Sequence, residues 1–317
     1  MFSHMDIGKD RMTVLADKAG GPLFFPVTPC DPRERLNLDA FRAHVREGVA
    51  AGCAGVFACC GTGEFPALGL DDYAACVEAA VEETAGRVPV IAGTGYGTSL
   101  ALTFAAAAEK AGADGLLALP PYLVHADQEG LRRHYENLAD GTALPVILYQ
   151  RDNAVFEPDT VVALARHPGV VGLKDGHGDL DLMQRIISAV RSQDGELLYF
   201  NGLPTAEMSA LAYRGLGVTL YSSAVFCFLP AVAVRFHRAL VDGDDATCAR
   251  LIDGFYRPFV ELRRQGSGYA VSLVKAGARL RGLDAGPVRA PLCEPAPEHV
   301  KRLGELIERG LALVEEP

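Results

Sequence analysis

The sequence lacks several features that mark large classes of proteins. It has no run rich in lysine and arginine, and its formal net charge is −10. Phosphate binding relies on clustered basic side chains, so nucleic acid is not expected as a partner. The opening stretch MFSHMDIGKDRM is polar and contains no apolar signal core. The glycine-rich stretch 93–97 lacks the GxGxxG spacing of a dinucleotide-binding turn.

Metal-binding and disulfide patterns are missing as well. The eight cysteines form no CxxC pair and no zinc-ligand spacing with histidine. We therefore expect no metal site, and we expect reduced, mostly buried thiols of a cytoplasmic protein. Cys59 and Cys60 are adjacent, which places them poorly for a stable disulfide, so we interpret both as buried thiols.

One nearly uncharged stretch, residues 217–234, is long enough to raise the question of a membrane span. Ser222 and Ser223 interrupt it, Pro230 breaks it, and β-branched residues are concentrated in its first half. These features predict a buried strand followed by the start of a helix, and no contact with a membrane.

Short apolar runs alternate with amphipathic or alanine-rich segments along the first 240 or so residues. Eight runs are continuously apolar, as parallel strands covered on both faces should be. The predicted strands are Leu23–Thr28, Gly55–Ala58, Val88–Ala92, Gly115–Leu119, Pro145–Tyr149, Val170–Lys174, Leu197–Phe200 and Val218–Ser222.

Helices fit between these runs. The predicted N-caps are Asn37, Asp71, Thr98 and Asp127, and Pro158 and Pro204 suit the first turns of two more helices. Regular alternation of strand and helix predicts right-handed crossovers and a parallel sheet. Eight such units, with 34 glycines for tight turns and 49% hydrophobic residues for a large core, favour a (β/α)₈ TIM barrel.

After about Asp242 the pattern predicts helices only, at roughly 244–264, 268–281 and 297–314. The expected organisation is an N-terminal segment (1–20), a catalytic barrel (21–242) and a C-terminal helical extension (243–317).

In such a barrel the active site lies at the C-terminal ends of the strands. Lys174 ends the sixth predicted strand, and alternation places it on the same face as Gly172, which leaves room for it. Burial there would disfavour the ammonium form and give a nucleophilic amine. The alternative is a structural lysine that either pairs with an acid or extends outward to solvent. Tyr149 ends the neighbouring strand, where a phenol can move protons during imine formation.

Two other stretches carry candidate binding residues. Arg151 follows Tyr149 and is able to bind a carboxylate through two parallel hydrogen bonds. Gly61 and Thr62 begin a loop, GTGE, whose small residues allow backbone N–H groups to approach an anion closely. Each feature alone also fits a solvated arginine or an ordinary glycine turn.

Six motifs taken together are far more specific than any one of them. They are GTGEF (61–65), LPPYL (119–123), LYQR (148–151), GLKDGHGD (172–179), GLPTAE (202–207) and YSSAVF (221–226). The combination resembles the dihydrodipicolinate synthase/N-acetylneuraminate lyase superfamily, from about Gly21 to the end of the chain. Within it, the likeness is greatest to the branch that dehydrates and decarboxylates a six-carbon keto sugar diacid, and residues 268–292 share that likeness.

The resemblance implies a role for each matching residue. Lys174 matches the lysine that forms a Schiff base, and Tyr149 matches the tyrosine that relays protons to it. Gly61 and Thr62 match the loop that holds the carboxylate beside the ketone, and Tyr122 matches a second tyrosine near the site.

The departures from the superfamily pattern bear on the substrate. Gly61 stands where synthases and aldolases usually have a hydroxyl residue, which interrupts a relay from Tyr149 to Tyr122. Ala154 stands where synthases have an arginine, and the usual YNR is YQR, with Gln150. Arg151 is therefore the candidate for the distal carboxylate, with Ser222 or Ser223 as the alternative.

The implied activity is that of a decarboxylating dehydratase for a small dicarboxylate keto acid, with no cofactor because the imine serves as electron sink. The resemblance also implies a homotetramer or homodimer. Two alternatives remain at this point: a pyruvate-dependent aldolase or synthase of the same superfamily, and a non-catalytic barrel that binds sugar acids.

Overall fold

The eight predicted strands all form, and they close into one parallel barrel in the order β1 to β8. The structure, a computed structural model, describes residues 20–315, so the expected N-terminal segment lies almost wholly outside the described residues, as do residues 316–317. The strands are β1 (Leu23–Phe24), β2 (Gly55–Ala58), β3 (Val90–Thr94), β4 (Gly115–Ala118), β5 (Val146–Gln150), β6 (Val170–Asp175), β7 (Leu198–Asn201) and β8 (Leu220–Ser223).

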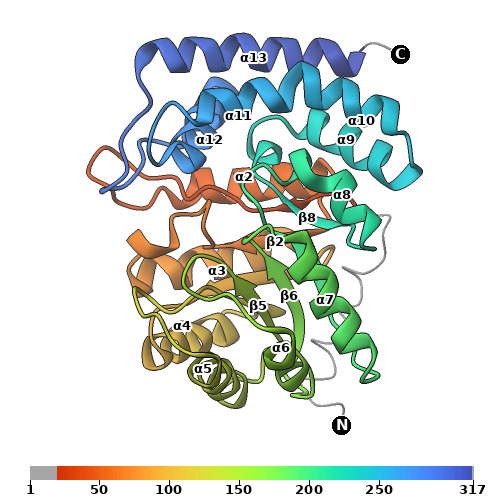
Figure 1. Cartoon of the computed structure of the whole chain (residues 1–317). Helices are drawn as coiled ribbons and strands as arrows, with labels where there is room; N and C mark the ends of the chain where they lie inside the picture. The colour runs from red at the N-terminus through yellow and green to blue at the C-terminus, as the bar shows by residue number, and fades with distance from the viewer. Residues whose placement is uncertain (1–19, 316–317) are drawn as a thin grey trace.

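Helices surround this barrel, each following a strand (Figure 1). They are α2 (Leu38–Ala50), α3 (Leu70–Thr84), α4 (Thr98–Lys110), α5 (Gln128–Asp140), α6 (Pro158–Ala165), α7 (Leu180–Arg191), α8 (Ala210–Gly215) and α9 (Pro230–Asp242). Short 3₁₀ turns η1 (Phe65–Ala67), η2 (Ala206–Ser209) and η3 (Val225–Cys227) precede α3, α8 and α9. The fold is therefore the predicted (β/α)₈ barrel.

The predicted helix starts are partly right. Asn37 and Asp127 cap α2 and α5, each accepting a hydrogen bond from a backbone N–H three residues on. The predictions for Asp71 and Thr98 are wrong by one or two residues, because glycines in extended conformation precede α3 and α4. Asp71 instead lies in the first turn, where its charge suits the helix dipole. Pro204 precedes η2 and starts no helix.

Aromatic side chains fill the inside of the barrel. Phe25 and Phe57 stack with ring centroids 4.5 Å apart, and Phe200 meets Phe57 edge to face. A Cβ on Gly172 would lie 2.9 Å from the Phe200 ring. The absent side chain of Gly172 thus makes room for Phe200, whereas the sequence pattern predicted that it makes room for Lys174.

Helices alone follow α9, namely α10 (Asp245–Leu251), α11 (Arg257–Arg263), α12 (Tyr269–Leu280) and α13 (Pro297–Glu315), and they gather at one end of the molecule (Figure 1). A π-helical segment, η4 (Ile252–Tyr256), joins α10 to α11, so the predicted single helix at 244–264 is continuous but changes its winding. No helix among residues 20–315 is long and apolar enough to cross a membrane. Residues 217–234 form β8, η3 and the start of α9.

A buried ionic cluster joins the barrel to these last helices. Glu64, in the loop after β2, has a left-handed backbone with φ of 59°. Its carboxylate accepts a hydrogen bond from Lys275 Nζ at 2.7 Å and another from the Arg289 backbone N–H at 2.6 Å. The exposed fractions of the Glu64 and Lys275 side chains are 1% and 0%. Three segments distant in sequence therefore meet at one buried carboxylate.

We predict that Lys275→Met lowers the free energy of unfolding by about 3–5 kcal/mol, because it removes the cation that hydrogen-bonds the buried Glu64 carboxylate and leaves only the Arg289 guanidinium, 3.6 Å away, as a counter-charge. Urea denaturation checks this. Arg257→Ala, which removes the exposed ion pair with Glu261, is the control and should cost under about 1 kcal/mol. Equal effects of Lys275→Met and Arg257→Ala would contradict the prediction.

Candidate active site

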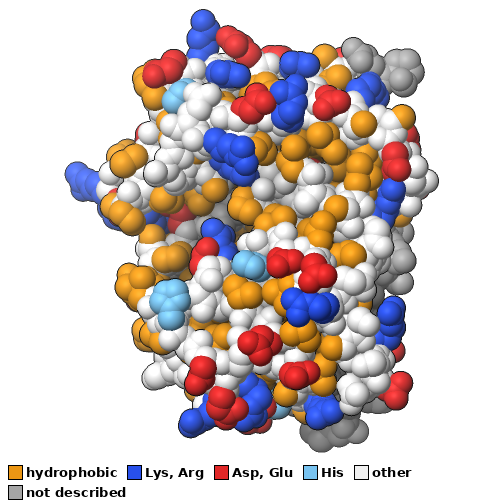
Figure 2. All heavy atoms as spheres, in the orientation of Figure 1, with side chains coloured by type: hydrophobic (Ala, Val, Ile, Leu, Met, Phe, Trp, Pro, Cys, Tyr) orange, Lys and Arg blue, Asp and Glu red, His pale blue; other side chains and the backbone are white. Residues whose placement is uncertain are grey.

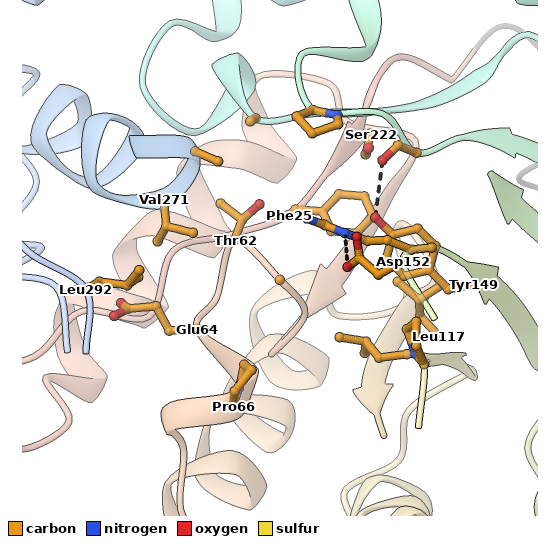
Figure 3. Close-up of a pocket in the computed structure, with 18 of the residues that line it drawn as sticks. Phe25, Thr62, Glu64, Pro66, Leu117, Tyr149, Asp152, Ser222, Val271 and Leu292 are labelled. Carbon is orange, nitrogen blue, oxygen red and sulfur yellow. Dashed lines mark hydrogen bonds and ion pairs between the residues drawn. The ribbon is translucent and has the colours of Figure 1, made fainter. Parts of the chain in front are cut away.

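A cavity of about 800 Å³ opens at the C-terminal ends of the strands. Every residue predicted to form the site lines it, namely Gly61, Thr62, Tyr122, Tyr149, Arg151, Lys174 and Ser222. Figure 3 shows Tyr149, Phe25 and Leu117 on the side of the strands, with Val271 and Leu292 on the opposite side. Since those two residues follow the barrel, the last helices complete the wall of the cavity.

Lys174 lies buried at the end of β6. Its Nζ is 3.8 Å from the centroid of the Tyr149 ring and 5.4 Å from that of Phe25. Nζ donates a hydrogen bond to the Gly202 carbonyl at 3.4 Å. No carboxylate forms an ion pair with Lys174 among the described residues.

Gly202 is a site residue that the sequence did not single out. A Cβ there would lie 2.5 Å from Lys174 Nζ and 2.7 Å from its Cγ. A side chain at this position would therefore displace the amine. Gly202 opens the GLPTAE motif, and that motif together with its place just after a strand was the signal for its importance.

Tyr149 pairs directly with Lys174 across β5 and β6, as predicted. Its hydroxyl donates to the same Gly202 carbonyl at 3.2 Å. Burial opposes ionisation of the phenol, but the charges of Lys174 and Arg151 outweigh that effect and lower the pKa of Tyr149 below its ordinary value. A phenol of lowered pKa is better suited to take and return protons.

Asp175, next to the lysine, fixes the end of β6. One carboxylate oxygen accepts hydrogen bonds from the Gln150 side chain at 2.9 Å and from the His177 backbone at 2.9 Å. The Tyr213 hydroxyl donates to the other oxygen. Gln150 thus points away from the cavity and helps to hold Asp175. The change from YNR to YQR therefore affects the hydrogen bonds that hold Asp175 and not the wall of the cavity.

The GTGE loop lies over the ends of β1 and β2. Thr62 is half-buried on the cavity wall, between the strand side and the last helices (Figure 3). A Cβ on Gly61 would meet no atom within 4 Å, whereas one on Gly63 would lie 3.1 Å from the Pro26 carbonyl. Packing therefore favours a glycine at 63 but places no such limit at 61. The space beside Gly61 belongs to the cavity.

The remaining predicted residues lie around the rim. Tyr122 is 63% exposed, and its ring meets that of Tyr96 edge to face. Arg151 is half-exposed and forms an ion pair with Asp152 at 3.0 Å. Ser222 faces the cavity, but Ser223 is buried behind β8 and donates to Glu207 at 2.5 Å. Ser223 as an alternative anchor is therefore wrong, because strand alternation turns it outward.

The thiols at the end of β2 are buried and free, as predicted. A hydrogen bond with Cys76, together with burial, raises the pKa of Cys59 well above its ordinary value. Burial raises the pKa of Cys60 to about 12. Both thiols are therefore poorly reactive. Among residues 20–315, no group of histidine, cysteine, aspartate and glutamate side chains is arranged to hold a metal ion.

A lysine buried against a tyrosine at the C-terminal mouth of a (β/α)₈ barrel defines the class of proteins that can form a Schiff base with a carbonyl substrate. Residues 18–309 match the Dihydrodipicolinate synthetase family. The chain therefore belongs to the dihydrodipicolinate synthetase family.

Relatives and solved structures agree with this membership. The chain is 70% identical over 308 residues to "Probable 5-dehydro-4-deoxyglucarate dehydratase 1" of Streptomyces coelicolor, covering 96% of each chain. It is 66% identical over 298 residues to "Probable 5-dehydro-4-deoxyglucarate dehydratase" of Streptomyces griseus, covering 93% of each. The crystal structure of dihydrodipicolinate synthase from Bacillus clausii superimposes with a TM-score of 0.85 at 26% identity, covering 93% of this chain and 98% of that one.

We predict that borohydride reduction in the presence of pyruvate attaches a covalent adduct to Lys174, because its amine lies in the cavity without an acidic partner. Peptide mass spectrometry locates the adduct. Lys174→Ala should abolish it, whereas Lys301→Ala, which removes an exposed lysine of α13, should leave it intact. An adduct on another lysine, or none, would overturn the assignment.

Proposed function

We propose that this chain is a decarboxylating dehydratase, a hydro-lyase that converts 5-dehydro-4-deoxy-D-glucarate to 2,5-dioxopentanoate, water and CO₂. The observation that carries the proposal is Lys174 buried against Tyr149 in the cavity, in a chain 70% identical to a relative named for this activity. The substrate is a small keto acid with two carboxylates.

The first stage is imine formation. The Lys174 amine attacks the ketone at carbon 5, and the carbonyl oxygen leaves as water after protonation. Tyr149 supplies and removes the protons, because its hydroxyl and Lys174 Nζ share the Gly202 carbonyl. The iminium then acidifies carbon 4, so that loss of a proton there gives an enamine.

The second stage removes water and CO₂. The enamine expels the hydroxyl of carbon 3 as water and leaves an iminium conjugated with a carbon–carbon double bond. Carbon 1 departs as CO₂, and the electron pair of its bond to carbon 2 flows through the conjugated system to the nitrogen. Protonation and hydrolysis release 2,5-dioxopentanoate and regenerate the Lys174 amine. The imine is the electron sink, so the mechanism requires no cofactor.

Five further residues are proposed to act on the substrate. Gly61 and Thr62 hold the carboxylate of carbon 6, beside the ketone, through the GTGE loop. Tyr122 and Ser222 contact the chain of the substrate from opposite parts of the wall. Arg151 contributes positive charge next to Tyr149, although Asp152 neutralises part of it.

The proposal also covers the oligomeric state of the enzyme and its cellular compartment. The neighbouring side chains Tyr122, Leu123 and Val124 are 63%, 77% and 57% exposed, and a second copy of the chain would cover such an apolar run. This supports a homodimer or homotetramer. The free thiols favour the cytoplasm, where cysteines stay reduced.

Product analysis tests the reaction directly. Incubation with 5-dehydro-4-deoxy-D-glucarate should release equal amounts of CO₂ and 2,5-dioxopentanoate, detected by mass spectrometry and trapping of CO₂. Lys174→Ala should release neither. Formation of pyruvate and an aldehyde in place of these products would identify an aldolase and overturn the proposal.

We predict that Tyr149→Phe lowers kcat by roughly 10²–10⁴-fold, the usual contribution of a positioned proton-transfer group. The steady-state rate with the six-carbon substrate measures the effect, and circular dichroism verifies the fold. Tyr199→Phe, on the adjacent β7, is the matched control, because that hydroxyl makes no hydrogen bond with a described residue. Turnover near that of the unmodified enzyme in Tyr149→Phe would show that the phenol only packs.

A further inference from the structure

Besides Arg151, two arginines line the cavity: Arg289, which pairs with Glu64, and Arg263, which the sequence did not single out. Arg263 is the last residue of α11, in the C-terminal helices. Phe259, one turn earlier on the same face, lines the cavity too. The π-helical segment Ile252–Tyr256 directly precedes α11, and its wider turn sets the direction of the residues that follow. Arg263 therefore faces the substrate space from outside the barrel.

Arg263 lacks an acidic partner, which sets it apart from Arg151. Arg151 is paired with Asp152, whereas Arg263 makes no ion pair with any residue between 20 and 315. Its one side-chain hydrogen bond there runs from Nη1 to the Thr205 hydroxyl at 2.5 Å. Burial and the adjacent Arg264 lower the pKa of the guanidinium below its usual value. In a protein of net charge −10, a half-buried guanidinium suits an anionic ligand when no described carboxylate binds it directly, although Glu207 attracts it at longer range.

The position of Arg263 relative to the amine is fixed by a single loop. This loop follows β7 and runs from Gly202 to Thr205. At its start the Gly202 carbonyl accepts hydrogen bonds from Lys174 and Tyr149. At its end the Thr205 hydroxyl accepts from Arg263. The imine-forming nitrogen and the unpaired guanidinium therefore lie along the same wall of one cavity.

We propose that Arg263 binds the distal carboxylate of the substrate, carbon 1, and so selects keto acids with two carboxylates. The assignment rests on the proposed function and deepens it. With carbon 5 joined to Lys174, the far end of the chain must meet a cation. Of the described arginines that line the cavity, Arg151 pairs with Asp152 and Arg289 pairs with Glu64, whereas Arg263 forms no ion pair. Its remaining N–H groups form the fork that matches a carboxylate.

The same contact orients the bond that breaks. Carbon 1 leaves most readily when its bond to carbon 2 stands perpendicular to the conjugated iminium, so that the electrons enter that system. A planar fork fixed by Thr205 at one corner sets the orientation of the carboxylate. Arg263 thus acts in binding and in orientation, while Arg151 acts mainly on Tyr149.

Two keto acids of equal chain length test the assignment without requiring turnover. One is 2-oxoadipate, which has a distal carboxylate, and the other is 2-oxohexanoate, which has a methyl group there. Borohydride trapping on Lys174 gives the half-saturating concentration of each. Arg263→Gln retains a donor for Thr205 but removes the charge, and Arg263→Lys retains the charge but not the fork. Arg264→Gln, its exposed neighbour, is the control, and Arg151→Gln is the comparison.

In Arg263→Gln, the half-saturating concentration of 2-oxoadipate should rise roughly 10–150-fold, the range for loss of a bidentate charged pair. That of 2-oxohexanoate should stay unchanged. Arg263→Lys should recover part of the loss, and Arg264→Gln should alter neither. An equal rise for both acids in Arg263→Gln would show a structural role and overturn the proposal. The proposal would also be overturned if Arg151→Gln lost the preference for 2-oxoadipate over 2-oxohexanoate and Arg263→Gln kept it.

The outcome also separates this proposal from the reaction itself. Selective loss of 2-oxoadipate binding, in an enzyme that fails to dehydrate 5-dehydro-4-deoxy-D-glucarate, would support Arg263 as a carboxylate anchor and reject the proposed reaction. Normal dehydration with an unchanged KM in Arg263→Gln would support the proposed reaction and reject Arg263 as the carboxylate anchor.

Discussion

The carboxylate of Glu64 is the group on which the geometry of the site depends. It is buried, it belongs to a loop with a left-handed backbone, and its partners come from α12 and from the segment before α13. A buried charge is tolerated only when it is paired and hydrogen-bonded. Thr62 stands two residues away on that loop, and Val271 stands four residues from Lys275 on the opposite wall. The ion pair therefore sets the width of the cavity as well as the path of the chain.

The chemistry proposed for Lys174 depends on three positions that carry no side chain. Gly172 admits Phe200 beneath the lysine, and Gly202 leaves the space that its amine occupies. Gly176 does the same for Tyr149, since a Cβ there would lie 2.8 Å from the phenol ring. A Schiff-base lysine must pass from amine to tetrahedral adduct to planar iminium in one place. These three glycines give that freedom, while Asp175 holds the backbone around it.

The local sequence pattern predicted the barrel well, but it predicted poorly how the C-terminal helices contact the barrel. Each strand was found because buried parallel strands are short continuous apolar runs, and the pairing of Tyr149 with Lys174 follows from strand order. Helix starts were right where a side chain caps, as at Asn37, and wrong where a glycine does, as at Gly69. Arg263 and Lys275 escaped notice because their partners are 58 and 211 residues away. No local periodicity encodes a contact of that range.

The dependence of the barrel on its last helices has a consequence for biosynthesis. A ribosome delivers the eight strands long before Lys275 and Arg289 emerge, and domains tend to fold from the N-terminus as they are made. Until then Glu64 of the nascent barrel lacks its partners Lys275 and Arg289, and the cavity lacks the part of its wall that the last helices supply. The site is therefore completed only at the end of translation. A chain that ends after α9 would leave Glu64 without its partners, and proteases that recognise incompletely folded proteins would act on it.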